Sequence, residues 1–396
     1  MSWRPQRLDQ LGSLSRGRSR HRPRDAAHLY DGPYPFIQTG DVKHAGLYIT
    51  DHKQTYSEAG LDQSKLWPTG TLCITIAANI ADTAILGFDA CFPDSVIGFI
   101  ADESKADTRF VKYLFDATIQ QQIQQFTQGA AQDNLSQEKL LSIEFLLPGV
   151  NEQRRIADIL SAYDDLIENN QQRMALLEDS ARQLYREWFI RLRFPGHEHT
   201  RITNGVPEGW KRKVLRDLCQ EIRETVSPES IDQDTPYIGL EHMPRRSISL
   251  SEWGRAEQVT SSKHRFHEGE ILFGKIRPYF HKVGIAFIDG VASSDAIVIR
   301  PLDLKVHGLV LMTVSSDPFV AVTAQTMREG SKMPRADWKQ MQEYPVALPP
   351  DGLLGSFASQ IQSIVEQLKT LSFANQKLRA ARDLLLPRLM SGEISA

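Results

Sequence analysis

Two long stretches of the chain place apolar residues at alternating spacings of three and four. The first stretch covers residues 156–188, and the second covers residues 361–389. This alternation is the a/d seam of a coiled coil, and each seam predicts a helix of roughly 45–50 Å. A single amphipathic helix of this length needs a partner to cover its apolar stripe. We expect the two helices to cover each other.

The expected helix pair is antiparallel, in a register where the numbers of facing residues sum to about 545. Asn170 then faces Asn375, and Leu184 faces Ile361. One Asn in each seam favours this pairing over two independent surface helices, because a buried Asn is costly unless it finds a polar partner. Pro387 lies inside the second pattern and should end or kink that helix. The residues assigned to this spacer coil are Leu160, Ile167, Asn170, Met174, Leu177, Leu184, Ile361, Leu368, Leu371, Asn375, Leu378 and Leu385.

The segments that precede the two helices have the patterns of mixed α/β domains. Helical spacing occurs over residues 109–126, and residues 308–325 are their counterpart, with a break expected at Pro318. Apolar runs rich in β-branched residues and bounded by Gly or Pro predict strands. These runs are residues 71–77, 95–101, 270–276, 282–288 and 295–300.

Six short stretches recur in the same order at an offset of about 200 residues. Each pair alone is weak, but their common order and offset indicate two tandem copies of a globular part followed by a helix. The pairs are FIQTGD with YIGLEH, WPTGTLCITI with FHEGEILFGKI, DSVIGF with DAIVIR, QGAAQDNLS with EGSKMPRAD, FLLPG with VALPP, and ARQLYREWF with ARDLLLPRL.

We therefore predict an α+β fold with two mixed α/β domains in tandem, separated by two long helices packed as an antiparallel coiled coil. The predicted parts are a first domain at residues 1–148, a central helical spacer at 149–195, a second domain at 196–348 and a C-terminal helical spacer at 349–396.

The composition is that of an ordinary globular protein. Of the 396 residues, 41% are hydrophobic and 24% are charged. No apolar run approaches the ~18–20 residues that span a bilayer, and the start MSWRPQRLDQ lacks the apolar core of a signal peptide. The scattered Cys73, Cys91 and Cys219 fit neither a disulfide framework nor a zinc site. We expect a reduced, cytoplasmic protein without a membrane partner.

Net charge argues against a chain that binds nucleic acid over its whole surface. The formal charge is −3, whereas phosphate contacts need Lys and Arg. Any DNA binding must therefore come from a local basic face or loop.

Catalytic motifs are weak in this sequence. Gly269, Gly274 and Lys275 match a phosphate-binding P-loop, but Ile276 replaces the Ser or Thr that would hold magnesium, and the segment reads as a strand. The HEH stretch at 197–199 lacks a third metal ligand nearby, which favours a solvated linker. We expect no catalysis and no metal site.

Basic and polar loops are better functional candidates. One arginine-rich loop lies in the first copy, one basic loop with a tyrosine lies in the second, and two further loops occupy equivalent places in both. Arg and Lys can hold phosphates or guanine edges, and Asn and Gln can pair with adenine edges. A single charged loop is usually a solvated surface, but equivalent positions in two copies favour DNA contact. The candidates are Arg18, Arg20, Arg22, Gln128, Gln132, Asn134, Ser136, Lys275, Arg277, Tyr279, Lys282, Lys332 and Arg335.

Three stretches resemble the specificity subunits of type I restriction–modification enzymes. They are LRAARDLLLPRLMSGEIS at 378–395, NEQRRIADILSAYDDLIENNQQRMALLEDSARQLYREWF at 151–189 and GVPEGWKRKVLRDL at 205–218. The resemblance covers almost the whole chain, and its order of two domains and two helices is specific.

This resemblance implies a division of labour. Each target-recognition domain would read one half of a split double-stranded DNA sequence, and the helices would fix the separation of the halves. The helices would also dock two methyltransferase subunits, and motor–nuclease subunits would complete the complex. S-adenosylmethionine, ATP and magnesium would then belong to the partners, with no cofactor in this chain.

Two other readings stay open. The chain could be the recognition subunit of a related type IIB system, or a coiled-coil scaffold that makes no contact with DNA.

Overall fold

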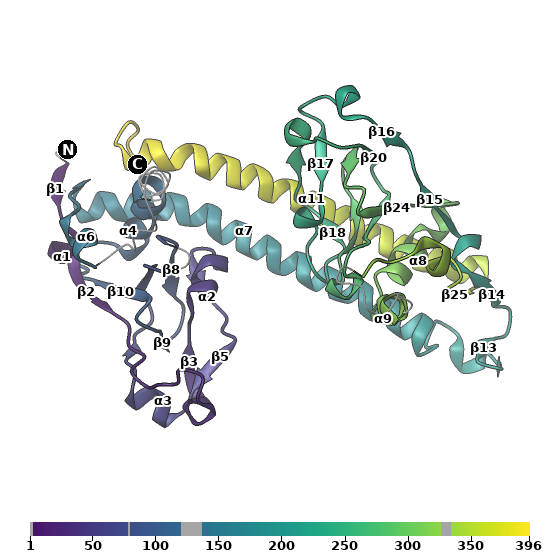
Figure 1. The fold of residues 1–396 in the computed structure, drawn as a ribbon, viewed down its shortest axis with the longest axis horizontal. Coiled ribbons are helices and arrows are strands. Elements are labelled where there is room, and N and C mark those ends of the chain that lie inside the picture. Colours follow the sequence, from purple (N-terminus) through teal and green to yellow (C-terminus); the bar gives the residue numbers. More distant parts are fainter. Residues whose placement is uncertain (1–2, 78–79, 120–136, 326–333) are drawn as a thin grey trace. The chain divides into compact units, whose positions relative to one another are not determined.

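The computed structural model describes residues 3–77, 80–119, 137–325 and 334–396 (Figure 1). The chain packs as two compact units, and each unit contains part of both long helices. The first unit is Met1–Asn169 together with Gln376–Ala396, and the second is Asn170–Asn375.

The first unit contains two sheets and a short two-stranded ladder. Its first sheet has the order β2 (Gly12–Arg16), β10 (Val96–Ala101), β7 (Leu72–Thr75), β8 (Thr83–Leu86) and β4 (Tyr48–Ile49). Its second sheet has the order β5 (Gln54–Tyr56), β3 (Tyr30–Phe36), β9 (Ala90–Cys91) and β6 (Leu66–Trp67). The ladder joins β1 (Arg4–Gln6) to β11 (Phe145–Leu147). The short helices are α1 (Leu8–Leu11), α2 (Thr39–His44), α3 (Glu58–Asp62), α4 (Thr108–Leu114) and α6 (Gln137–Ser142).

The second unit has the corresponding sheets. Its first sheet has the order β15 (Cys219–Ile222), β24 (Ala296–Pro301), β21 (Ile271–Gly274), β22 (Val283–Ala286) and β18 (Ser249–Leu250). Its second sheet has the order β16 (Thr225–Val226), β20 (Lys263–Phe266), β23 (Gly290–Ala292), β17 (Pro236–Ile238) and β19 (Gly254–Arg255). The ladder pairs β14 (Lys211–Val214) with β25 (Pro345–Leu348), and β12 (Ile202–Thr203) pairs with β13 (Val206–Pro207). The helices inside this unit are α8 (Leu304–Val314), α9 (Asp317–Gln325) and α10 (Trp338–Met341).

The two five-stranded sheets that begin with β2 and β15 share one connectivity. In each of them the first three neighbouring pairs are antiparallel and the last pair is parallel. All five predicted strands are present, as β7, β10, β21, β22 and β24. The structure also has the expected break before Pro318, between α8 and α9. Over 109–126, helix α4 passes into a π-helical turn at Phe115–Ile119, and the remaining positions lie outside the described residues.

Both units bury their sheets against the long helices α7 (Val150–Tyr185) and α11 (Asp351–Met390). In the first unit, Ile156 and Leu160 of α7 join a core that contains Phe110. In the second unit, Ile361 and Leu368 of α11 pack with the apolar residues of α8. Burying a side chain of this size stabilises the fold by about 1.5–3 kcal/mol, so each unit uses the helices as part of its own core.

Helices α7 and α11 are antiparallel neighbours in the second unit. Asn170 Nδ2 donates to Asn375 Oδ1 at 2.9 Å, and the ring centroids of Trp188 and Phe357 lie 5.7 Å apart. Both pairs have numbers that sum to 545, which is the predicted register. Inside the first unit, the ion pair of Arg382 with Asp164 fits the same register.

All twelve spacer residues named from the sequence are buried or partly buried. Leu184 and Ile361 belong to one apolar cluster. Large apolar residues outside the seam, such as Leu176 and Leu384, are exposed by 68% and 65%. The heptad pattern therefore identified the inward face of both helices.

We expected Pro387 to end or kink the last helix, and the first of these two outcomes is wrong. Helix α11 continues through Pro387 to Met390. A proline this close to the end removes one helical hydrogen bond and leaves only three more helical residues to place. Leu389 and Met390 are buried in the core of the first unit, and this burial favours continuing the turn.

Length and apolar composition were compared with those of a membrane span for the helices of the described residues. Within the described part of the chain, no single helix is both long and apolar enough to cross a bilayer. Helices α8 and α9 meet that criterion only together, and they are bent by 63°.

Candidate nucleic-acid interface

The segment between β21 and β22 carries four of the residues predicted to bind DNA. They are Lys275, Arg277, Tyr279 and Lys282. Because β21 and β22 are adjacent antiparallel strands, this segment is a connection at the end of the sheet, where side chains can project outward. The fold thus presents three cations and one tyrosine from a single turn.

Arg335 lies beside this segment through a backbone contact. Ile276 forms an isolated antiparallel bridge with Arg335, and the Arg335 guanidinium lies 3.4 Å from the Asp295 carboxylate. Lys275 Nζ donates to the Ser294 carbonyl oxygen at 3.1 Å, and burial lowers the pKa of Lys275. The structure therefore brings together Lys275 and Arg335, two predicted DNA-binding residues that are 60 positions apart in the sequence.

A second group of cations surrounds Phe280. The guanidinium carbons of Arg245 and Arg277 lie 4.0 Å and 5.8 Å from the Phe280 ring centroid, within the range of cation–π attraction. Lys282 Nζ donates to the Leu240 carbonyl, and burial lowers the pKa of Lys282, with Arg245 adding to the effect. Arg245 was not predicted from the sequence, although the arginine doublet in MPRRS is a usable signal.

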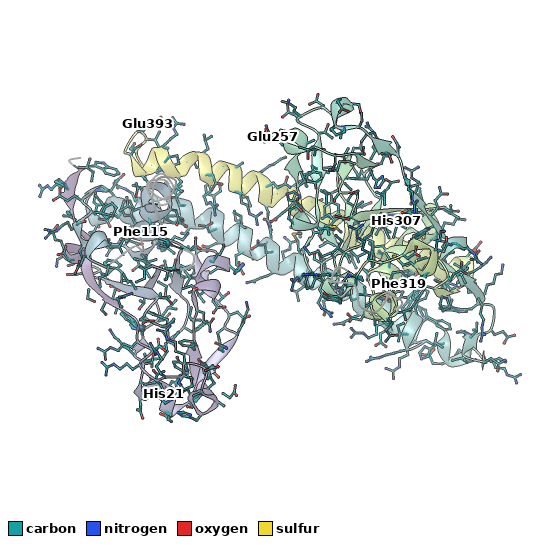
Figure 2. All side chains as sticks on the ribbon, viewed as in Figure 1. His21, Phe115, Glu257, His307, Phe319 and Glu393 are labelled. Atoms are coloured by element: carbon teal, nitrogen blue, oxygen red, sulfur yellow. The ribbon has the colours of Figure 1, made fainter. Side chains whose placement is uncertain are left out.

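The arginine-rich loop of the first unit is only partly free to bind. Arg22 donates from its guanidinium to two backbone carbonyls of its own loop, both at 2.7 Å. The side chains of Arg18 and Arg20 are exposed, and His21 marks the same loop in Figure 2. Arg18 and Arg20 are thus the better placed of the three candidates for contact with an external anion.

Five candidates cannot be placed. Lys332 and the polar residues Gln128, Gln132, Asn134 and Ser136 lie outside the described residues. Their part in DNA contact stays a prediction.

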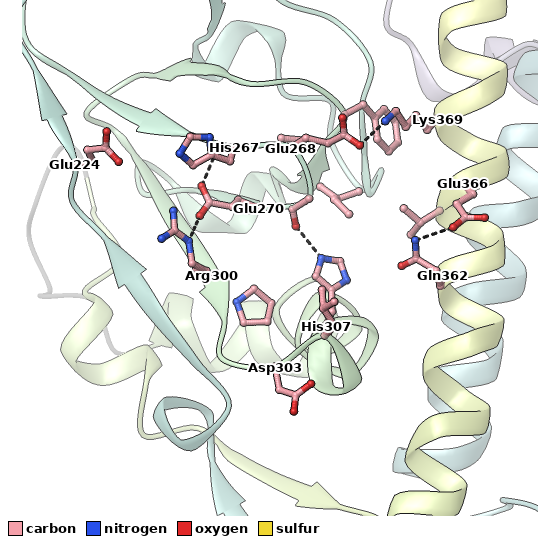
Figure 3. Close-up of a pocket in the computed structure, with 17 residues that line it drawn as sticks. Glu224, His267, Glu268, Glu270, Arg300, Asp303, His307, Gln362, Glu366 and Lys369 are labelled. Carbon is pink, nitrogen blue, oxygen red and sulfur yellow. Dashed lines mark hydrogen bonds and ion pairs between the residues drawn. The ribbon is translucent and has the colours of Figure 1, made fainter.

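One cavity of the second unit has the wrong charge for DNA. It has a volume of about 640 Å³ and lies between the sheet, α8 and α11 (Figure 3). Its lining contains five carboxylates, and its two permanent cations already pair with two of them, Arg300 with Glu270 and Lys369 with Glu268. Negative charge repels phosphates, so this cavity and the basic turn are chemically distinct surfaces.

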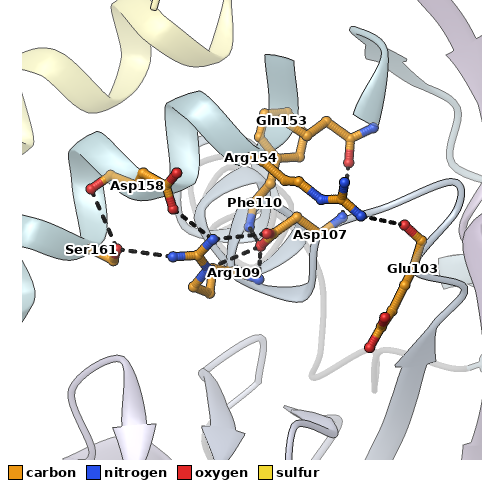
Figure 4. A network of polar contacts seen from close by, with 8 residues as sticks. All are labelled: Glu103, Asp107, Arg109, Phe110, Gln153, Arg154, Asp158 and Ser161. Carbon is orange, nitrogen blue, oxygen red and sulfur yellow. Dashed lines mark hydrogen bonds and ion pairs between the residues drawn. The ribbon is translucent and has the colours of Figure 1, made fainter. Parts of the chain in front are cut away.

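A polar network fastens the globular part of the first unit to α7 (Figure 4). Asp107 caps α4 by accepting from the backbone N–H of Arg109 at 2.9 Å. The Arg109 guanidinium contacts Asp107 at 2.9 Å and Asp158 of α7 at 2.8 Å, and Asp107 raises the pKa of Arg109. In the second unit, Gly308 of α8 packs directly against Ile361 of α11. The two joints differ in chemistry, one being ionic and the other apolar.

The two segments whose sequences suggested a nucleotide or metal site do not have the local structure of such a site. The GEILFGKI segment contains strand β21, and a short 3-10 turn at Pro278–Phe280 follows it where a P-loop would open an α-helix. The 197–199 stretch is a 3-10 turn without buried residues. Among the residues described, no group of three or more His, Cys, Asp or Glu side chains could hold a metal ion.

Comparison with known proteins gives a consistent result at the level of sequence. Residues 2–179 match the family model of the type I restriction modification DNA specificity domain. The type I restriction enzyme MjaIX specificity subunit of Methanocaldococcus jannaschii is 22% identical, over 99% of this chain and 93% of its own length. The type I restriction enzyme EcoDI specificity subunit of Escherichia coli is 21% identical, over 88% of this chain and 78% of its own length.

A solved structure shares the fold. The type I restriction–modification system S subunit of M. genitalium superposes with a TM-score of 0.59 at 15% identity. The match covers 98% of this chain and 96% of that subunit.

Proposed function

We propose that this chain, which resembles type I restriction–modification specificity subunits in sequence and in fold, is such a subunit and selects the DNA sequence on which a type I complex acts. In this proposal residues 1–148 and 196–348 are two target-recognition domains. Residues 149–195 and 349–396 are the helical spacers between them. Each domain reads one half of a bipartite target in double-stranded DNA.

The observation that carries this proposal is a repeated sheet with dissimilar loops. The sheets that begin with β2 and β15 have one connectivity, yet the turn that joins β7 to β8 differs from the turn that joins β21 to β22. In the first unit this turn reads IAANIAD at 76–82, with no cation or aromatic residue, whereas the second unit has Lys275 to Lys282. A repeated scaffold with different side chains on its loops suits two unlike half-sites.

The helices suit a spacer with a defined register. The antiparallel pairing of Asn170 with Asn375 is a polar contact inside an apolar seam, and such a contact specifies register. A fixed helix register would set the distance between the half-sites, as dimer geometry does in other DNA-binding proteins.

The outer faces of the helices suit protein partners. Leu166, Leu176 and Leu384 lie outside the seam and are exposed by 54–68%. We assign these faces to two methyltransferase subunits, with motor–nuclease subunits completing the complex. Catalysis then belongs to the partners, and S-adenosylmethionine, ATP and magnesium bind there rather than in this chain.

Salt dependence of DNA binding tests the proposal. The purified subunit with its methyltransferase partners is titrated with duplex DNA at several salt concentrations. We expect the logarithm of affinity to fall with the logarithm of salt, by a slope of about 0.9 for each phosphate neutralised.

Two substitutions in the second unit sharpen this test. R277A removes a cation from the basic turn and should lower the slope by about 0.9. K369A removes a cation from the acidic cavity and should leave the slope unchanged. Binding that is insensitive to salt, or absent, would contradict the proposed function.

A further inference from the structure

The turn between β21 and β22 has an unusual backbone. Arg277 has φ 50° and ψ 61°, and His281 has φ 54° and ψ 52°, so both residues adopt the left-handed conformation. Residues other than Gly, Asn, Asp and His rarely adopt it, and each instance in a residue other than Gly costs on the order of 1–3 kcal/mol. Strain of this kind persists only where the surrounding structure holds it in place.

Several hydrogen bonds hold this turn. Phe280 N donates to Arg277 O, and His281 N donates to Pro278 O, both at 2.8 Å. Arg277 N donates to Pro334 O at 2.9 Å. The buried Pro278 also fixes its own backbone angle. These contacts tie one end of the turn to the segment that carries Arg335.

The other end of the turn is fixed by His281. Its imidazole Nε2 lies 2.7 Å from the Ser315 carbonyl oxygen, and its own carbonyl accepts from Arg246 N at 2.9 Å. His281 is buried, with Asp317 3.5 Å from Nδ1. The turn is therefore clamped at both ends.

What this clamped turn presents is Tyr279. This residue is 52% exposed, although the segment that carries it is held at both ends. The Tyr279 ring meets Phe280 edge to face, with centroids 5.0 Å apart. Phe280 is in turn held by the guanidinium group of Arg245. The Tyr279 ring thus packs against Phe280 and remains accessible to a ligand.

The first unit has a left-handed residue at one of the two corresponding positions, but it lacks the aromatic and basic side chains of this turn. Ala81 has φ 68° at the position that corresponds to His281. The seven residues of its turn, 76–82, contain no aromatic side chain. Of these two corresponding turns, the one in the second unit is therefore the one that carries an exposed aromatic side chain.

We infer that Tyr279 is a base-contacting residue that stacks on, or wedges against, a base of the half-site read by the second unit. This inference rests on the proposed function and adds a chemical role to one residue of it. The surrounding Arg245, Arg277 and Lys282 hold the flanking phosphates, which positions the ring over the base edges. In duplex DNA a side chain reaches the face of a base by wedging between base pairs, and a rigid, exposed ring beside cations suits such an insertion.

The test compares Y279A and Y279F with the unchanged chain, each expressed with its methyltransferase subunits. Sequencing the methylated adenines gives the target of each complex. With Y279A, we expect one half of the target to lose discrimination at one or two positions while the other half is unchanged. Binding to the full target should weaken roughly five- to 150-fold. Y279F keeps the ring and should retain both the target and the affinity.

The matched control is Tyr48, which is 38% exposed on β4 of the first unit. Y48A should leave the target unchanged. Thermal unfolding identifies any variant that loses its fold, and Y279L, which keeps bulk without a ring, then replaces Y279A. An unchanged target in Y279A, or an equal loss at both halves, overturns the inference. A wild-type complex that methylates no bipartite target overturns the proposed function instead.

Discussion

The hydrogen bond between Asn170 and Asn375 gives a prediction that can be worked out in free energy. Asn375 is only 4% exposed, whereas Asn170 is partly exposed. N170L leaves the buried amide of Asn375 without its partner. N375L leaves Asn170 unpaired, but that amide can still reach water. Removing one partner of a buried polar pair costs about 1–3 kcal/mol, so N170L should fall at the upper end of this range and N375L at the lower end.

The double variant should behave differently from the sum of its parts. Replacing both amides with Leu removes both unpaired groups and extends the apolar seam, which is nearly neutral or stabilising. The coupling free energy should therefore be about 2 kcal/mol or more in favour of the double variant.

Urea unfolding of the four proteins at 25 °C measures this coupling. N169L is the matched control, because Asn169 is the exposed neighbour on the same helix and should change stability by no more than about 0.5 kcal/mol. Additive losses in the double variant would show that the two amides do not interact, and the register would then be wrong.

Three further predictions concern the second unit. Phe357 is fully buried against Trp188, so F357A should lower the free energy of unfolding by about 3–5 kcal/mol in thermal or urea denaturation; a loss below 1 kcal/mol would refute that packing. Glu178 accepts from the backbone N–H and hydroxyl of Ser249 at 3.2 Å and 2.7 Å, so E178Q should destabilise by about 1–3 kcal/mol, and an unchanged melting temperature would contradict this role. Burial lowers the pKa of His281, so the unfolded chain binds a proton that the folded chain does not. The free energy of unfolding should therefore fall as the pH drops below about 6.5. In H281N, Asn tolerates the left-handed backbone and carries no titrating group. The Tm of H281N should therefore drop less between pH 7.5 and 5.5 than the Tm of the unchanged chain.

The elements that follow from regular spacing were predictable. Strands β7, β10, β21, β22 and β24 are buried on both faces or nearly so, and such strands read as continuous apolar runs. The helix register was predictable because each seam contains one Asn, and a buried amide has few places where it can be satisfied. The repeat supplied the correspondence between the two sheets.

Features that depend on tertiary packing were not predictable. Local rules place a break at Pro387, but burial of Leu389 and Met390 outweighs them. The left-handed conformation of Arg277 has no local signal, since Arg rarely adopts it, and the enrichment of His in that conformation is too small to place His281 there. Their clamping depends on partners that are distant in sequence, and this same clamping gives Tyr279 its exposed position.

The central claim is that this chain specifies a split target with two unlike halves. Sequencing methylated adenines in cells that express the chain with its methyltransferase subunits tests this claim most directly. The account predicts one motif with two specified parts of different sequence, separated by an unspecified gap of constant length. A contiguous motif, two identical halves, or methylation that does not depend on this chain would contradict it.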